Sequence, residues 1–162
     1  MFPPRMVTLA ATVLTEAKAR GLRIATAESC TGGLIAGLLT EIAGSSEVVE
    51  RGFVTYSNDA KIEEIGVPEA LIAAHGAVSE PVARAMAEGA IRHARAELAV
   101  AVTGIAGPGG GTADKPVGLV HIAVARVSGQ TLQEEHRFGD IGRSQVRMQT
   151  VEAALRLVLK LL

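Results

Sequence analysis

Hydrophobic residues recur at helical spacing near the start of the chain and then give way to a short apolar run. Between Met6 and Arg20 they return every three to four positions, which predicts an amphipathic helix, and Gly21 is typical of the residue after a helix end. Residues 22–27 are mostly apolar and predict a first strand. A second helical pattern covers residues 33–42. The stretch between these two elements is therefore a turn from a strand into a helix.

The middle of the chain alternates between strand and helix patterns in the same way. Residues 48–55 predict a second strand. Ser57 is a candidate N-cap for a short helix, and Pro68 is placed to begin another. Ser79 is expected to cap a long helix that runs to about Arg95. Helices thus separate the second predicted strand from the third.

The last part of the chain predicts three strands and a final helix. Residues 97–102 are apolar without alternation, which is typical of a strand buried on both faces. Residues 117–127 predict a fourth strand, and the polar alternation of 131–138 predicts its antiparallel hairpin partner. Ser144 begins a C-terminal helix. We therefore predict one α/β domain over residues 1–162, with three layers (α/β/α) and a mixed, mostly parallel sheet that ends in a late antiparallel hairpin.

Composition narrows the class of protein without changing this architecture. Hydrophobic residues make up 48% of the 162 residues and aromatic residues only 2%, so we expect a core of alanine, valine, leucine and isoleucine. The net charge is −1, and the chain has neither the basic field nor the aromatic platforms that nucleic-acid binding needs. No apolar run approaches about 18 residues, so no membrane span is expected. Cys30 is the only cysteine and the N-terminus has no signal-peptide pattern, which predicts a cytoplasmic protein without disulfides.

The turn after the first predicted strand carries the first candidate chemistry. It reads Ala27-Glu28-Ser29-Cys30-Thr31-Gly32-Gly33. A serine at such a corner can be held clear of the core, and the backbone N–H groups of the next four residues can stabilise an oxyanion or bind a phosphate. Cys30 is a rival nucleophile, because a helix N-terminus lowers the pKa of a thiol, but a small buried cysteine under the turn is the commoner state. The simplest alternative is that Ser29 or Thr31 only caps the helix.

Tyr56 and Lys61 form the second candidate group. Tyr56 ends the second predicted strand, and Lys61 lies in the first turn of the next helix, where its charge opposes the helix dipole. A buried lysine with a lowered pKa can act as the general base for a serine. The alternative is a surface lysine beside a tyrosine at the edge of the core, and residue type alone favours it because most lysines are exposed.

A glycine-rich loop after the third predicted strand is the third candidate. Thr103 ends that strand, and the loop reads Gly104-Ile105-Ala106-Gly107-Pro108-Gly109-Gly110-Gly111. Ligands collect beyond the carboxyl ends of strands in open α/β sheets, and such a loop can wrap N–H groups around an anion, with Lys115 fixing its far end on a phosphate. The alternative is a flexible connector. The four histidines lie in separate elements without ligand spacing, so no metal site is predicted.

Five motifs along the chain are far more specific together than any is alone. They are, in order, Ala27-Glu28-Ser29-Cys30-Thr31-Gly32-Gly33, Tyr56-Ser57-Asn58-Asp59-Ala60-Lys61, Gly76-Ala77-Val78-Ser79, Thr103-Gly104-Ile105-Ala106-Gly107-Pro108-Gly109-Gly110 and Lys115-Pro116-Val117-Gly118. With these motifs the chain closely resembles the CinA C-terminal domain family over residues 7–161, whose stand-alone members are nicotinamide-nucleotide amidohydrolases. The resemblance implies a single such domain over residues 1–162, an α/β/α fold, a homo-oligomer, and neither a metal nor a cofactor.

The resemblance also implies a reaction and the residues that perform it. The carboxamide of nicotinamide mononucleotide is hydrolysed to nicotinate mononucleotide and ammonia, a step of pyridine nucleotide salvage. Ser29 is implied to be the nucleophile and Lys61 the base, which takes the serine proton directly or through Tyr56. Two other functions stay open: a non-catalytic nucleotide-binding module, and an amidase for a different substrate.

The predicted substrate-binding residues come from the turn, the glycine loop and the start of the last helix. They are Cys30, Thr31, Gly32, Gly33, Thr103, Gly104, Gly107, Gly109, Gly110, Lys115 and Arg143. Arg143 departs from the Gly-Asp-Arg pattern of many members, because Ile141 and Gly142 separate it from Asp140.

Overall fold

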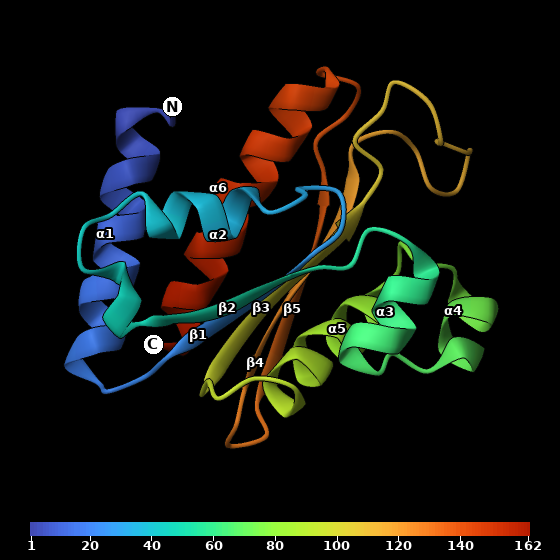
Figure 1. Cartoon of the computed structure of the whole chain (residues 1–162). Coiled ribbons are helices and arrows are strands. Elements are labelled where there is room, and N and C mark those ends of the chain that lie inside the picture. The colour runs from blue at the N-terminus through green and yellow to red at the C-terminus, as the bar shows by residue number, and fades with distance from the viewer.

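Five strands form one sheet in the spatial order β2-β1-β3-β4-β5 (Figure 1). The computed structural model describes residues 1–162, the whole chain. The helices and strands are α1 (Pro4–Ala19), β1 (Ile24–Glu28), α2 (Leu34–Thr40), the 3-10 helix η1 (Ser45–Glu47), β2 (Val49–Val54), α3 (Asn58–Ile65), α4 (Glu69–His75), α5 (Glu80–Arg92), β3 (Leu98–Gly104), β4 (Leu119–Arg126), β5 (Thr131–Arg137) and α6 (Arg143–Leu161).

Strand directions confirm the predicted mixed sheet. β1 pairs in parallel with β2 on one side and with β3 on the other. β4 is antiparallel to β3, and β5 is antiparallel to β4 and forms the late hairpin. Only β4 therefore runs against the common direction. Helices α1, α2 and α6 cover one face of the sheet and α3, α4 and α5 the other, so the three predicted layers are confirmed (Figure 1).

The two faces of the sheet bury side chains of different size. Large aliphatic residues of β1, β3 and β4, such as Leu98, Val100 and Ile122, pack under α1 and α6. The alternate positions on the same strands are alanines and pack under α5. Small side chains let a helix approach the sheet closely, and Gly89 of α5 extends this close packing, because a Cβ there would collide with the Ile65 carbonyl at the end of α3. α5 thereby holds α3 against the sheet.

The parallel strands bring three of the sequence motifs to one edge of the sheet. β2, β1 and β3 are neighbours that run in the same direction, so their carboxyl ends lie together. The Ser29 turn follows β1, the Tyr56–Lys61 segment follows β2, and the glycine loop follows β3. In open α/β sheets this edge is where ligands bind. The topology alone therefore predicts one common site for the three motifs.

Local signals predicted the helix starts with mixed success. The Ser57 side chain accepts a hydrogen bond from the Ala60 amide and caps α3, as predicted. Ser79 occupies the N-cap position of α5, but the prediction that its side chain caps the helix is wrong, because its hydroxyl donates to the Gly76 carbonyl instead. α6 begins at Arg143, one residue before the predicted start. None of the helices is both long and apolar enough to span a bilayer.

Candidate active site

The turn after β1 is closed by its own backbone. The Ser29 amide donates to the Val102 carbonyl of β3, which ties the turn to the neighbouring strand. The Gly32 amide donates to the Ser29 carbonyl over 3.0 Å and completes the turn. Ser29 is 8% exposed, so its hydroxyl lies at the bottom of the site and not on the open surface.

The cap of α2 is the Glu28 carboxyl group, which is fully buried. It accepts hydrogen bonds from the amides of Gly33, Ile35 and Ala36 at 2.9–3.1 Å. It also accepts one from the Thr31 hydroxyl at 2.6 Å. The interpretation that Ser29 or Thr31 only caps the helix is therefore wrong, because a carboxyl group from the preceding strand already takes the free N–H groups of the first helical turn. The Ser29 hydroxyl remains available for chemistry.

Glu28 also narrows the set of N–H groups that can hold an anion. The Gly33 amide is bound to Glu28 and the Gly32 amide to the Ser29 carbonyl. The amides of Cys30 and Thr31 have no acceptor within the protein. Of the four predicted donors, the structure thus leaves two free.

Lys61 is buried beneath the turn, with 1% of its surface exposed. Its Nζ lies 3.2 Å from Ser29 Oγ and 2.9 Å from the Thr55 carbonyl oxygen. The carbonyls of Tyr56 and Ser57 lie at 3.4 Å. The interpretation of Lys61 as a surface residue is wrong, because its side chain reaches from α3 to the Ser29 turn and to the carbonyls that follow β2.

Burial lowers the pKa of the Lys61 amine, because a charged ammonium loses more hydration than a neutral amine when it is enclosed by protein. The carbonyls around it are hydrogen-bond acceptors and carry no formal charge. A neutral amine has one lone pair, and of its close neighbours only the Ser29 hydroxyl can donate to it. The pair is therefore arranged for transfer of the serine proton to the lysine.

Tyr56 and Arg143 stand at the mouth of the site. The Tyr56 side chain is exposed, and its hydroxyl accepts a hydrogen bond from Arg143 Nη2 at 3.1 Å. Arg143 Nη1 donates to the Gly107 carbonyl at 3.0 Å. The Tyr56 hydroxyl is thus bonded to Arg143 and has no contact with Lys61 or Ser29. The structure supports direct proton transfer over a relay through Tyr56.

A cavity of about 240 Å³ joins these groups. It is lined by Ser29, Cys30, Tyr56, Asn58, Lys61, Ala77, Val78, Thr103, Gly104, Ala106 and Arg143. Sequence reasoning did not select four of these as site residues: Asn58, Ala77, Val78 and Ala106. Each lies within one of the quoted motifs, so the motif boundaries were the signal that could have found them. The Thr103 hydroxyl donates to the Ala77 carbonyl and so joins two walls of the cavity.

Several predicted binding residues lie outside this cavity. Thr31, Gly32 and Gly33 belong to the turn but do not line the cavity, and the Thr31 hydroxyl bonds to Glu28. Gly107 is buried behind Arg143. Gly109 and Gly110 are exposed further along the loop. The Lys115 amine donates to the His75 carbonyl at 2.6 Å, which ties the loop to the end of α4.

Cys30 lines the cavity, but its thiol is unsuited to act as a nucleophile. Burial raises the pKa of this thiol to about 12. At neutral pH the group is therefore a protonated thiol, and the thiolate is the reactive form of cysteine. The structure favours Ser29 over Cys30 for covalent chemistry at this turn.

The arrangement of these motifs matches one known family. The CinA C-terminal domain matches residues 6–162 of the chain. The chain belongs to the CinA C-terminal domain family. This match covers every residue that lines the cavity.

Individual relatives of this CinA C-terminal domain fall into two length classes. A CinA-like protein of Anaeromyxobacter dehalogenans is 56% identical over 90% of this chain and 35% of its own length. The chain thus spans about a third of the length of the CinA-like proteins that it matches. Nicotinamide-nucleotide amidohydrolase PncC of Escherichia coli is 54% identical over 86% of this chain and 84% of its own length. The crystal structure of a competence/damage inducible protein from Agrobacterium tumefaciens superimposes with a TM-score of 0.98, at 55% identity, over 99% and 98% of the two chains.

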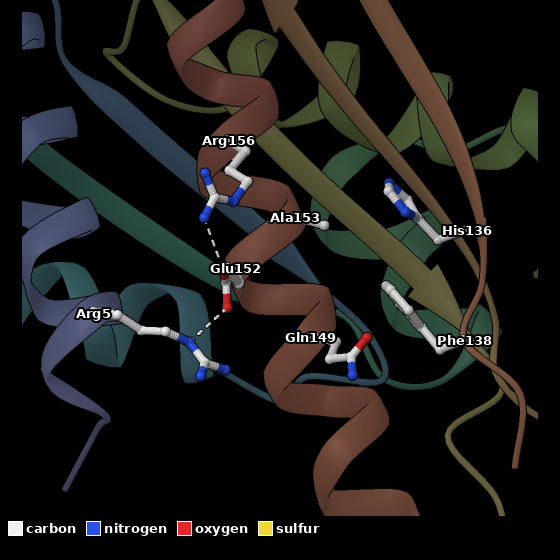
Figure 2. A pocket seen from close by; sticks show the side chains of 7 residues that line it. All are labelled: Arg5, His136, Phe138, Gln149, Glu152, Ala153 and Arg156. Carbon is white, nitrogen blue, oxygen red and sulfur yellow. Dashed lines mark hydrogen bonds and ion pairs between the residues drawn. The ribbon is translucent and has the colours of Figure 1, made fainter. Parts of the chain in front are cut away.

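A second and larger cavity of this CinA C-terminal domain lies between α1, α6 and β5 (Figure 2). We call it the arginine groove. It measures about 520 Å³ and is lined by Arg5, His136, Phe138, Gln149, Glu152, Ala153 and Arg156. Arg5 and Arg156 both bond to the carboxyl group of Glu152 between them (Figure 2). The groove holds neither a serine nor a buried lysine, so the smaller cavity is the candidate active site.

Proposed function

We propose that this chain is an amidohydrolase that hydrolyses the carboxamide of nicotinamide mononucleotide to nicotinate mononucleotide and ammonia. The observation that carries the proposal is the distance of 3.2 Å between the buried Lys61 Nζ and Ser29 Oγ, with backbone carbonyls as the other close partners of the amine. The identity of the substrate is supported by the PncC relative, which matches over most of both chains. Serine with a lysine base is a known combination for acyl transfer.

The first half of the reaction transfers the acyl group to the enzyme. Ser29 Oγ forms a bond to the carboxamide carbon, and its proton moves to Lys61 Nζ. The carbonyl oxygen becomes an oxyanion, which the free amides of Cys30 and Thr31 stabilise. Lys61 then returns the proton to the nitrogen, the carbon–nitrogen bond breaks, and ammonia leaves.

The second half hydrolyses the ester. Water attacks the acyl carbon while Lys61 takes one of its protons, and a second oxyanion forms against the same amides. The bond to Ser29 Oγ breaks, the proton on Lys61 passes to that oxygen, and the acid product is released. The lysine ends neutral, as it began, so no external base or cofactor is consumed.

The size of the cavity assigns parts of the substrate to parts of the site. About 240 Å³ lies below the usual 300–1,000 Å³ of ligand pockets. The cavity therefore takes the pyridine carboxamide, while the ribose phosphate extends past its mouth. Arg143 stands at that mouth and is the candidate phosphate contact, with Thr103 and Gly104 along the wall.

Incubation with nicotinamide mononucleotide tests the proposal directly. Wild-type protein is expected to release ammonia and nicotinate mononucleotide in equal amounts, and Ser29→Ala to release neither while its melting temperature stays unchanged. Tight binding of the nucleotide without either product would instead make the chain a binding module. Ammonia release from another amide, but none from this nucleotide, would contradict the assigned substrate.

A further inference from the structure

One arginine from the last helix reaches the serine turn from outside the cavity. Arg147 of α6 donates from Nε to the Cys30 carbonyl at 3.1 Å and from Nη2 to the Thr31 carbonyl at 3.0 Å. The guanidinium is half-buried, and its two acceptors are successive carbonyls of the same turn. Both acceptors are uncharged carbonyls, and the Glu28 carboxyl group holds the same turn through the Thr31 hydroxyl.

These two bonds determine how the peptide groups of the turn are oriented. In a trans peptide the N–H points opposite to the C=O of the same plane. The Cys30 carbonyl shares its plane with the Thr31 amide, and the Thr31 carbonyl shares its plane with the Gly32 amide. The Gly32 amide closes the turn on Ser29, and the Thr31 amide has no acceptor. Arg147 thus holds the carbonyl end of two peptide planes: the one whose N–H is the free Thr31 amide, and the one whose N–H closes the turn on Ser29.

Arg147 and Glu28 hold the turn from opposite ends. The Glu28 carboxyl group accepts hydrogen bonds from the Thr31 hydroxyl and from the first amides of α2. Arg147 donates hydrogen bonds to the Cys30 and Thr31 carbonyls. After both sets of bonds are made, the Cys30 and Thr31 amides are the polar backbone groups left over. A buried amide without a partner costs stability, and it serves catalysis when a negative charge develops beside it.

We propose that Arg147 is a positioning residue for the hydrolysis, which orients and polarises the turn that stabilises the oxyanion. The inference rests on the proposed function. A cation bonded to a carbonyl draws electron density through the peptide and makes the N–H at its other end a stronger donor. That gain is largest when the acceptor is an oxyanion, so Arg147 acts on the transition state more than on bound substrate.

Arg147→Met tests this role through the separation of kcat from KM. Direct loss of one oxyanion donor lowers kcat by about 10²–10³-fold, and we expect an indirect effect of at least about tenfold, with KM within about threefold. Arg156→Met is the matched control on the same helix, since Arg156 contacts only the arginine groove. An unchanged kcat for Arg147→Met would overturn the inference. So would a loss explained wholly by a lower melting temperature.

A second pair of variants keeps the test valid if Arg147→Met folds poorly. Lysine retains the charge but cannot bridge two carbonyls with a planar fork, so Arg147→Lys is expected to have an intermediate kcat. Millimolar guanidinium chloride is expected to raise the kcat of Arg147→Ala and to leave wild type unchanged. Failure of both Arg147→Lys and added guanidinium to recover any kcat would assign Arg147 a structural role and overturn the inference.

The Ser29→Ala variant separates this inference from the function on which it rests. If Ser29→Ala is inactive and Arg147→Met has the kcat of wild type, only the role of Arg147 fails. If Ser29→Ala retains turnover, the serine mechanism fails whatever Arg147 does.

Discussion

The two cavities of this protein differ in whether their charged side chains are exposed and paired or buried without a counter-ion. In the arginine groove, Arg5 and Arg156 share the carboxyl group of Glu152, and their side chains are 72% and 64% exposed. In the candidate active-site cavity, Lys61 is 1% exposed and its close partners are backbone carbonyls and one hydroxyl. The groove is larger, but each of its strong charges has a partner and contact with water.

This difference in the burial of charge distinguishes the two cavities better than their size does. Exposed ion pairs are screened by water and contribute about 0–1 kcal/mol each to the free energy of unfolding, so breaking one changes stability little. A buried amine without a counter-ion is unfavourable as a cation, and it responds by a lower pKa. Lys61, beside Ser29, is the one lysine of the chain that is buried in this way.

Removal of the buried amine is expected to have the largest effect. Lys61→Met keeps the length of the side chain but removes the base, so kcat should fall by about 10²–10⁴-fold, the usual contribution of general base catalysis. Lys160→Met removes an exposed lysine and is the matched control, with turnover close to that of wild type. Ammonia release under saturating substrate measures both. Retention of more than a tenth of wild-type kcat by Lys61→Met would refute the role of Lys61.

The same variant should change how stability depends on pH. The pKa of Lys61 is lower in the folded protein than in the unfolded chain, so between these two values the unfolded state binds more protons. The free energy of unfolding of wild type should therefore gain a rising contribution with pH across that window, up to about pH 10.4, the ordinary lysine value. Urea titrations across this pH range should show the rise in wild type and its absence in Lys61→Met. Parallel curves for the two proteins would contradict a lowered pKa.

The reactivity of the Cys30 thiol tests how burial acts on a second group in the candidate active-site cavity. Because burial raises its pKa to about 12, the thiol should react slowly with iodoacetamide at pH 8 in the folded protein and quickly after unfolding. Cys30→Ala should keep kcat within about fivefold, because the proposed role of Cys30 is that of its backbone amide, which the substitution retains. Loss of turnover comparable to that of Ser29→Ala would make Cys30 the better nucleophile.

The arginine groove should give the smallest effect. Glu152→Gln removes the carboxylate that both arginines share, and we expect the free energy of unfolding to change by about 1 kcal/mol or less. Turnover should stay within about twofold of wild type. A large loss of turnover in this variant would show that the groove is coupled to the reaction, and the contrast between the two cavities would no longer hold.

Patterns local in sequence predicted the fold well. Apolar periodicity placed the order of helices and strands, and the non-alternating run at residues 97–102 marked β3 as buried on both faces. Because parallel neighbours end at one edge, strand order then brought Ser29, Lys61 and Thr103 to the same cavity. The predicted homo-oligomer and cytoplasmic location stay predictions.

Contacts between residues far apart in the sequence could not be predicted from local patterns. The burial of Lys61 depends on how α3 lies against the turn after β1 and the segment after β2, which position in a helix does not reveal. No local pattern assigned a role to Glu28, whose carboxyl group caps α2. Arg147 lies 117 residues from Cys30, and no spacing rule connects them. Lys115, expected beside a phosphate, instead fastens the loop to His75.

Titration of Lys61 by NMR tests the central claim most directly. The chain contains only four lysines, so protein labelled with ¹³C at the lysine ε-carbon gives few signals, and Lys61→Arg identifies the one that belongs to Lys61. We expect the Lys61 signal to titrate below the ordinary lysine value of about 10.4, which would increase the fraction of neutral amine beside Ser29. A Lys61 signal that titrates at or above that value would contradict the account, because the amine would then be a cation unable to take the serine proton.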